Sequence, residues 1–192
     1  MNILTHILMS RKVYPYVNKF FSYDLSLAHL IWGSIKPDLT NSDISHCKNE
    51  TFYLFYKKLE FIQSLNIKEN RDRYSLELGE ISHYLCDYFC YAHNNKELLK
   101  YLAHISYEKN LHKTAKKIGD QLYYTGYSDF SYLTFLEMIE HKHRIYLATT
   151  PSYENDIIYS YEIILSVSYK LAKEANLISN TEKIEYPYIN AL

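Results

Sequence analysis

The sequence predicts an all-α protein built as a single-domain helical bundle. Of its 192 residues, 47% are hydrophobic, which is enough to bury a full core and excludes a disordered chain. With 4 Gly and 4 Pro, the chain has too few turn residues for a many-stranded barrel or sandwich. Apolar side chains recur at helical spacing along most of its length. We therefore expect long helices joined by polar loops, in one domain covering residues 1–192.

The first part of the chain is predicted to hold two short helices and a long loop. Apolar side chains at helical spacing place the helices at residues 4–20 and 23–32. Gly33 and Pro37 are expected to end the second helix, because both residue types disfavour helix interiors. We expect the loop that follows to run as far as His46.

A buried central helix is the main feature predicted for the rest of the chain. An amphipathic helix at residues 52–65 precedes it, and residues 74–91 are apolar nearly all round, as is typical of a helix surrounded by others. Further helices are expected near residues 96–118, 129–146 and 154–176. The polar exceptions in the central helix are Glu77, Glu80, His83 and Asp87.

Charge, cysteine content and hydropathy exclude several classes of function. Lys and Arg total 21 against 22 Asp and Glu, so the chain has no basic excess with which to bind long nucleic acid. Its 3 Cys argue against a disulfide framework and for reduced thiols. The basic pair Arg11-Lys12 follows the first apolar patch, the reverse of a secretory signal, so we expect a cytoplasmic protein. No apolar stretch reaches the roughly 18 residues of a transmembrane helix, and none is expected.

Two pairs of potential metal ligands at helical spacing are the main indication of function. His83 and Asp87 are one turn apart on the central helix, and His104 and Glu108 are one turn apart on the next, with His93 between the pairs. Zinc binds imidazole, carboxylate or thiolate groups, which a helix presents on one face at positions i and i+4. Because Asp87 lies in an apolar helix, where an unpaired carboxylate is costly, metal coordination would keep it ionised.

Other interpretations of these side chains stay open. A single histidine is compatible with a hydrogen-bonded core residue, and an i,i+4 pair with an ion pair on a helix. Cys86 and Cys90 offer a rival ligand set. With His83 and His93 they would suit a structural zinc site, although cysteines also pack as small core side chains. The charged residues 141–143 (His-Lys-His) predict a solvated face.

The order of these residues along the chain is specific. Thr5-His6 is followed by Pro37-Asp38, by Ser45-His46, by LGEISHYLCDYFCYAHN at residues 78–94 and by His104-x-x-x-Glu108. The long stretch contains H-x-x-x-D with another histidine six residues after the aspartate. This pattern resembles that of the zinc-dependent bacterial phospholipase C family, and its motifs span roughly residues 1–108.

The resemblance implies an all-helical fold of the zinc-dependent phospholipase C type that binds two to three zinc ions in a cleft. No C-terminal lipid-binding β-domain is expected. The ligands that the resemblance implies fall into three sets: Asp38, His46, His83 and Asp87 for one zinc; His93, His104 and Glu108 for a second; and His6, Asp87 and the amine and carbonyl of Met1 for a third. Asp38 would also orient or deprotonate the attacking water.

The function that the resemblance implies is that of a zinc-dependent phosphoric diester hydrolase. It would hydrolyse a phospholipid or a related small phosphoester with water activated by several zinc ions. Two alternatives stay open. One is a zinc phosphoesterase like the 3′-nucleotidases and single-strand nucleases, and the other is a non-catalytic helical protein stabilised by zinc. An open coordination position distinguishes a catalytic zinc site from a structural one.

Overall fold

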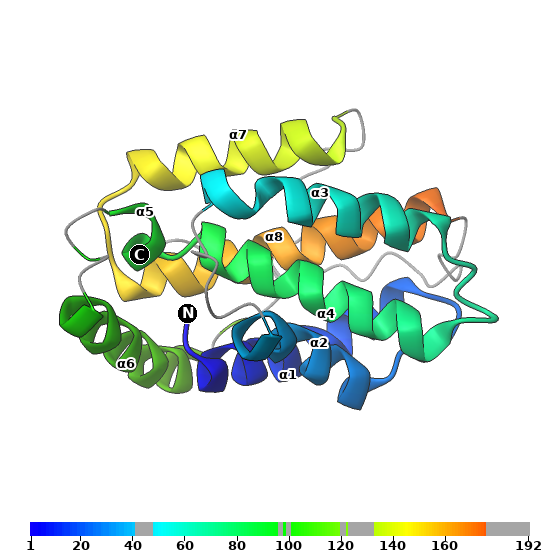
Figure 1. Ribbon diagram of the computed structural model, residues 1–192, viewed down its shortest axis with the longest axis horizontal. Helices are drawn as coiled ribbons and strands as arrows, with labels where there is room; N and C mark the ends of the chain where they lie inside the picture. Colours follow the sequence, from blue (N-terminus) through cyan, green and yellow to red (C-terminus); the bar gives the residue numbers. More distant parts are fainter. Residues whose placement is uncertain (41–47, 96–97, 99–100, 120–121, 123–132, 176–192) are drawn as a thin grey trace.

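The computed structural model describes residues 1–40, 48–95, 98, 101–119, 122 and 133–175 (Figure 1). These residues form eight helices and no strand, which confirms the prediction of an all-α protein. The helices are α1 (Ile3–Phe20), α2 (Leu27–Thr40), α3 (Lys48–Ser64), α4 (Arg71–Tyr88), α5 (Tyr91–Asn94), α6 (Tyr101–Ile118), α7 (Phe135–Ala148) and α8 (Tyr153–Glu174). The single-domain organisation over residues 1–192 and the lack of a C-terminal β-domain stay predictions.

Helix α4 lies at the centre of the bundle, as predicted, although it begins and ends three residues earlier than residues 74–91. It packs against α1, α2, α3 and α8, and Figure 1 shows it running between them. From Tyr74 to Tyr88 every residue except Leu76 is buried. The carboxylates and the imidazole on this helix must therefore find their partners inside the protein.

Two glycines let α2 and α4 cross in direct backbone contact. A Cβ atom added to Gly33 would overlap the carbonyl oxygen of Leu76, and one added to Gly79 would overlap the carbonyl oxygen of Leu30. Neither position can hold a larger residue unless the two helices separate. The close crossing brings the C-terminal end of α2, which carries Asp38, alongside α4.

Helix α2 corrects the prediction for residues 33–40. We expected Gly33 and Pro37 to end the helix and to leave Asp38 in a loop, but α2 continues through all three residues to Thr40. Gly33 and Pro37 are both buried, and Gly33 lies at the crossing with α4. Tertiary packing against α4 outweighs the low intrinsic helix propensity of these residues.

Helices α5 to α8 complete the bundle. Helix α8 packs against α1, α4, α6 and α7. The helix predicted near residues 96–118 begins only at Tyr101, and the separate short helix α5 precedes it. The helices predicted at 129–146 and 154–176 correspond to α7 and α8, although α7 begins at Phe135 and ends at Ala148, and α8 begins at Tyr153 and ends at Glu174. Residues 129–132 and 176 lie outside the described part of the chain. None of the described helices is both long enough and apolar enough to cross a bilayer, in agreement with the prediction.

Candidate metal centre

His83 and Asp87 lie one turn apart on the buried face of α4. Both are 0% exposed, and His83 Nε2 lies 3.3 Å from Asp87 Oδ2. The other ring nitrogen, Nδ1, lies 2.9 Å from the carbonyl oxygen of Ser34 on α2, to which it donates a hydrogen bond. This bond fixes the tautomer and leaves the Nε2 lone pair directed at the centre. Every residue has a backbone carbonyl group, so the sequence could not indicate that the one of Ser34 accepts this hydrogen bond.

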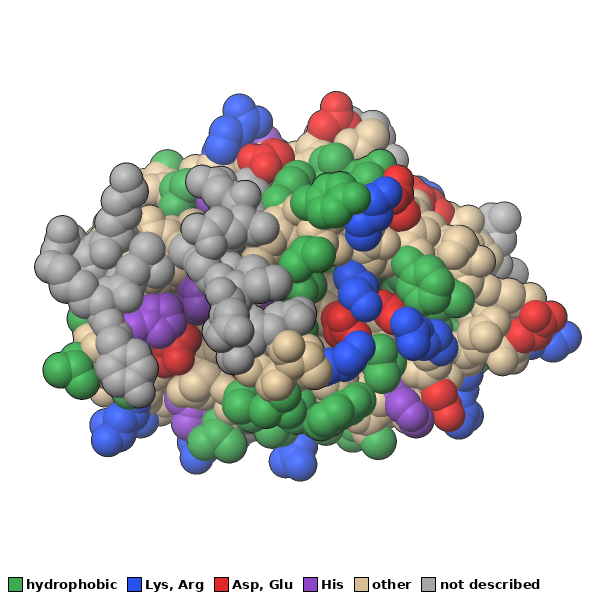
Figure 2. Space-filling model, viewed as in Figure 1, with side chains coloured by type: hydrophobic (Ala, Val, Ile, Leu, Met, Phe, Trp, Pro, Cys, Tyr) green, Lys and Arg blue, Asp and Glu red, His purple; other side chains and the backbone are tan. Residues whose placement is uncertain are grey.

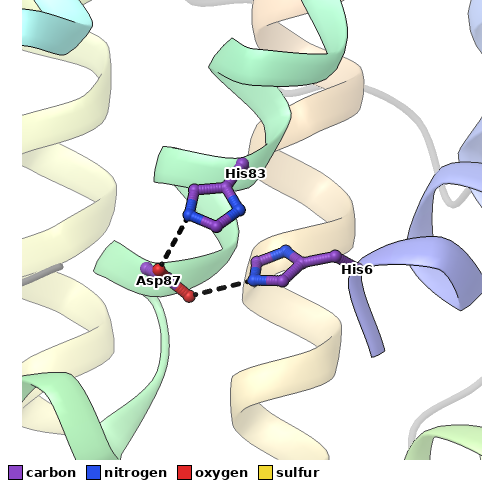
Figure 3. Close-up of side chains that lie close together, drawn as sticks. All are labelled: His6, His83 and Asp87. Atoms are coloured by element: carbon purple, nitrogen blue, oxygen red, sulfur yellow. Dashed lines mark ion pairs between the residues drawn. The ribbon is translucent and has the colours of Figure 1, made fainter. Parts of the chain in front are cut away.

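His6 reaches the same carboxylate from α1. Its Nε2 lies 3.3 Å from Asp87 Oδ1, and its ring stacks on that of His83 with centroids 4.2 Å apart. Figure 3 shows both imidazoles directed at Asp87 from two different helices. Asn2 starts α1, because its side-chain oxygen accepts a hydrogen bond from the backbone N–H of Thr5. Together these contacts hold the first turn of α1 against α4.

The Met1 amine lies between the two predicted groups of ligands. It pairs closely with Asp87 Oδ1, lies 2.9 Å from His93 Nε2 and lies 3.3 Å from Glu108 Oε1. The Asn2 side chain donates a hydrogen bond to the backbone carbonyl of Glu108, at 3.1 Å, which ties the start of the chain to α6. Asn2 was not among the predicted site residues; an asparagine three residues before Thr5 is the helix-capping signal that could have indicated it.

The second group consists of His93 on α5 and of His104 and Glu108 on α6. His104 Nε2 lies 3.0 Å from Glu108 Oε1, and His93 Nε2 lies 3.4 Å from the same oxygen. His93 Nε2 is also 3.6 Å from Asp87 Oδ1. The two groups therefore lie side by side, and Asp87 of the first is the residue that His93 of the second approaches.

Asp38 lies at the edge of the centre. Its Oδ1 is 3.8 Å from His83 Nε2, and its side chain is 20% exposed, whereas Asp87 is fully buried. The position on α2 follows from the close crossing of α2 and α4. His46, the remaining predicted ligand, lies outside the described residues.

Burial and clustered charge set the ionisation of the centre. Burial alone would raise the pKa of Asp87, but the Met1 amine and the surrounding imidazoles outweigh it and hold that pKa well below its usual range. The pKa of His93 is lowered to about 4, first by burial and then by the Met1 amine. At neutral pH Asp87 is thus a carboxylate and His93 a neutral imidazole, which are the forms that bind zinc.

The Met1 amine behaves differently. Burial lowers its pKa, but the groups around the amine, with the carboxylates of Asp87 and then Glu108 among them, together outweigh burial and raise the pKa well above its usual value. In this arrangement the protonated amine supplies positive charge to the centre. It would release its proton on coordinating a metal ion.

Three nitrogen–oxygen distances between the potential ligands match those expected around a zinc ion. Tetrahedral zinc, with bonds of about 2.0–2.1 Å to nitrogen and oxygen, separates neighbouring ligand atoms by about 3.3–3.4 Å. The nitrogen–oxygen distances of His83 and His6 to Asp87 are both 3.3 Å, and that of His93 to Glu108 is 3.4 Å. Charge-assisted hydrogen bonds between such groups are shorter, at about 2.7–2.9 Å. For these three pairs the spacing suits a cation between the atoms better than a direct hydrogen bond. By contrast, His104 Nε2 lies within hydrogen-bond distance of Glu108 Oε1, at 3.0 Å, and the Met1 amine donates directly to Asp87.

His6 provides a second sign of fit. It is 1% exposed, and among the described residues neither of its ring nitrogens has a hydrogen-bond partner. Burying a polar nitrogen without a partner costs free energy, so a native protein rarely leaves one unsatisfied. A metal ion beside Asp87 would satisfy this imidazole.

The rival ligand set with two cysteines is not assembled in the described part of the chain. Two groups of three potential ligands form there, His6, His83 and Asp87, and His93, His104 and Glu108, and neither contains a cysteine. Cys86 and Cys90 belong to the hydrophobic core instead. Burial raises the pKa of both thiols, so they stay protonated, whereas zinc binds the thiolate.

The solvated face predicted at residues 141–143 is only partly present. Lys142 and His143 are 9% and 6% exposed, because the apolar stripe of α7 turns them towards the core. Lys142 pairs with Glu162 on α8 at 2.6 Å. His143 Nε2 donates a hydrogen bond to the carbonyl oxygen of Tyr88, at the end of α4, at 3.0 Å. This histidine therefore helps to fix the C-terminal end of α4, next to Asp87.

Comparison with known proteins identifies the family. A family model described as zinc dependent phospholipase C matches residues 5–153, which is more than half of the chain. A search of curated proteins and a search of solved structures each gave no match. The matched stretch includes every ligand candidate from His6 to Glu108. The chain belongs to the zinc-dependent phospholipase C family.

Proposed function

We propose that this protein is a zinc-dependent phosphodiesterase of phospholipase C type that hydrolyses a phospholipid or a related small phosphoester. The observation that carries the proposal is the convergence of groups on one oxygen, Asp87 Oδ1. The Met1 amine, His6 and His93 all approach it, from three different helices or chain segments. A buried carboxylate with this environment, in a chain of this family, supports a centre of two to three zinc ions.

The proposed ligands fall into the same three sets that the resemblance implies. The distances between the described members of these sets, and the buried His6 imidazole without a hydrogen-bond partner, support the assignment. The sets are Asp38, His46, His83 and Asp87; His93, His104 and Glu108; and Met1, His6 and Asp87. Zinc bound there would polarise the phosphoryl oxygens, lower the pKa of water and stabilise charge on the leaving oxygen.

Asp38 is the proposed general base. Of the three carboxylates in the described centre it is the most exposed, with 20% against 13% for Glu108 and 0% for Asp87. A base must reach the proton that it removes, and Asp38 is placed to accept one from water arriving at the edge of the centre. The water oxygen then bonds to phosphorus and the bond to the glycerol oxygen breaks. That oxygen would take up a proton, returned by Asp38 or supplied by solvent, and leave as the alcohol of diacylglycerol, while the headgroup keeps the phosphate.

Access to solvent supports catalysis over a purely structural zinc site. A structural site is closed by its protein ligands, whereas a catalytic one keeps a position open. Here the side chains of His104 and Asp38 are 22% and 20% exposed. Figure 2 shows imidazole groups and a carboxylate reaching the surface together, at the end of the bundle where Figure 1 places α5 and α6.

The test is hydrolysis by zinc-loaded protein whose chain begins at Met1. A phosphocholine ester and a phosphatidylcholine are compared with a 3′-nucleotide, before and after a chelator. We expect phosphocholine release that the chelator stops and added zinc restores. His83→Ala and Glu108→Ala should abolish it, whereas His29→Ala, which removes a 42% exposed histidine outside the centre, should leave it unchanged.

Three outcomes would contradict the proposal in different ways. Hydrolysis of the 3′-nucleotide alone would move the substrate to the nucleotidase class. Zinc binding without hydrolysis of any of the three would favour the non-catalytic alternative. Equal loss of activity in His29→Ala would show that the ligand variants act through general instability rather than through the metal centre.

A further inference from the structure

Asp156, in the first turn of α8, is a buried carboxylate outside the candidate metal centre. It is 0% exposed and accepts hydrogen bonds from groups on three other helices. The donors are the backbone N–H of Tyr91 at 2.9 Å, the hydroxyl of Tyr107 at 2.9 Å and the hydroxyl of Tyr146 at 2.7 Å. They belong to α5, α6 and α7 respectively, so this one carboxylate ties three helices to α8.

Two of these three helices carry the second group of proposed ligands. Tyr91 is two residues before His93 on α5, and Tyr107 directly precedes Glu108 on α6. A four-residue helix such as α5 cannot hold its own conformation in isolation. The position of His93 relative to Glu108 therefore depends on what α5 and α6 bind in common, and Asp156 is bound by both.

The junction between α4 and α5 is fixed from its other side as well. The Asn94 side chain donates hydrogen bonds to the carbonyl oxygens of Tyr88 and Cys90, at 2.8 and 2.9 Å. His143 Nε2, on α7, donates to the same Tyr88 carbonyl. The backbone between Asp87 and His93 is thus held by side chains from α5, α7 and α8. This arrangement leaves little freedom in the position of the His93 ring.

We propose that Asp156 is a positioning residue of the metal centre: by binding α5 and α6 together it sets the distance between His93 and Glu108. The inference rests on the proposed function, because it gives these two residues the role of zinc ligands. Residues that hold ligands in place typically contribute about 10- to 100-fold to metal affinity. Asp156 contacts neither the substrate nor the metal in this account and acts only through the ligands.

A matched pair of tyrosine variants tests the proposal. Tyr107→Phe and Tyr146→Phe each remove one hydroxyl that binds Asp156. Tyr107 lies on α6, which carries proposed ligands, whereas Tyr146 lies on α7, which carries none of them. Zinc bound per chain is measured across a series of zinc buffers, together with the absorption spectrum of the cobalt-substituted protein and the thermal unfolding of the metal-free protein. Asp156→Asn is measured in the same way.

The expected result is a separation of metal affinity from stability. Tyr107→Phe and Asp156→Asn should weaken one zinc site about tenfold or more and alter the cobalt spectrum. Tyr146→Phe should lower the unfolding temperature of the metal-free protein and keep the affinity of the wild type. If Asp156→Asn does not fold, the proposal is tested by the difference in zinc affinity between Tyr107→Phe and Tyr146→Phe.

Two results would overturn the inference, and they are distinguishable. Wild-type zinc affinity in both Tyr107→Phe and Asp156→Asn would reduce Asp156 to a structural role and leave the proposed function standing. Failure of the wild-type protein to bind zinc would remove the proposed function and this inference with it.

Discussion

The two halves of α4 bury carboxylates in opposite ways. In the N-terminal half, Glu77 and Glu80 are 0% and 4% exposed, and the ammonium group of Lys58 lies 2.9 Å from an oxygen of each. Arg73 also pairs with Glu77, and Lys36 lies 2.6 Å from Glu80. In the C-terminal half the described partners of the carboxylate are imidazoles and the chain's own amine: His6, His83, His93 and Met1 around Asp87.

The difference lies in the kind of partner and not in the degree of burial. Lysine and arginine side chains are charged at neutral pH, so the carboxylates of the N-terminal half are neutralised by side chains of the protein. Imidazoles in neutral form bring lone pairs and little charge, so the C-terminal half has donors suited to a metal cation. A buried carboxylate on a helix is therefore a poor sign of a metal site by itself. The imidazoles around it are the informative feature.

The largest effect should come from removing one carboxylate in each half. Asp87→Asn takes away the proposed shared ligand, so we expect the loss of at least one zinc ion per chain and a fall in phosphoester hydrolysis of about 10³-fold or more. Glu77→Gln, the matched change in the other half, should keep both zinc and activity and only lower stability. Elemental analysis and initial rates measure the two effects. Equal zinc loss in the two variants would contradict the inference that only the C-terminal half of α4 takes part in metal binding.

A fourth buried carboxylate, Asp156, extends the comparison, because its described partners are hydroxyl, thiol and backbone amide groups. Burial raises its pKa from 3.8 to about 6, against the opposing effect of hydrogen bonds from Tyr146, Tyr91, Tyr107 and Cys90. The folded protein thus holds a proton that the unfolded chain releases, and the stability from this group is complete below pH 4 and lost as the pH rises to 6.

The size of this loss is roughly 3 kcal/mol, since each pKa unit corresponds to about 1.4 kcal/mol. The measurement is chemical denaturation of metal-free wild type and Asp156→Asn between pH 4 and 6. The wild type should lose stability relative to the variant over this range. A stability difference that does not change with pH would show that Asp156 has an ordinary pKa.

A smaller effect is expected at the crossing that joins the two halves of α4 to α2. Gly79→Ala would force the helices apart, with an expected cost of about 1–3 kcal/mol and weaker zinc binding because Asp38 moves away from His83. Gly119→Ala is the control, because its added carbon meets only the flexible end of the Lys12 side chain. Denaturation curves and zinc titrations of the two variants should differ accordingly. An unaffected Gly79→Ala protein would contradict the close packing of α2 on α4.

Much of the fold could be predicted because the spacing of apolar residues along a helix is a local property, which does not depend on how the helices pack together. The apolar character of residues 74–91 predicted a central helix, and the i,i+4 spacing placed His83 beside Asp87 and His104 beside Glu108. Both pairs are in contact in the structure. These predictions rest on local geometry, which the sequence specifies directly.

The features that could not be predicted depend on contacts between distant segments. The continuation of α2 through Pro37 requires a partner helix whose glycine matches Gly33. Asp156 lies in the first turn of α8, after the helix-capping Ser152, and an aspartate at such a position is usually exposed to solvent. Its burial results from the packing of α5, α6 and α7 around it, which the sequence does not show. His143 is similar, because a histidine in a charged stretch gives no sign that it faces the core.

The metal content of protein whose chain begins at Met1 tests the central claim most directly. Protein purified without a chelating resin is analysed for zinc per chain, before and after dialysis against a chelator. The account predicts two to three zinc ions that the chelator removes and added zinc restores. The absence of zinc, or a single ion that survives prolonged chelation, would contradict it.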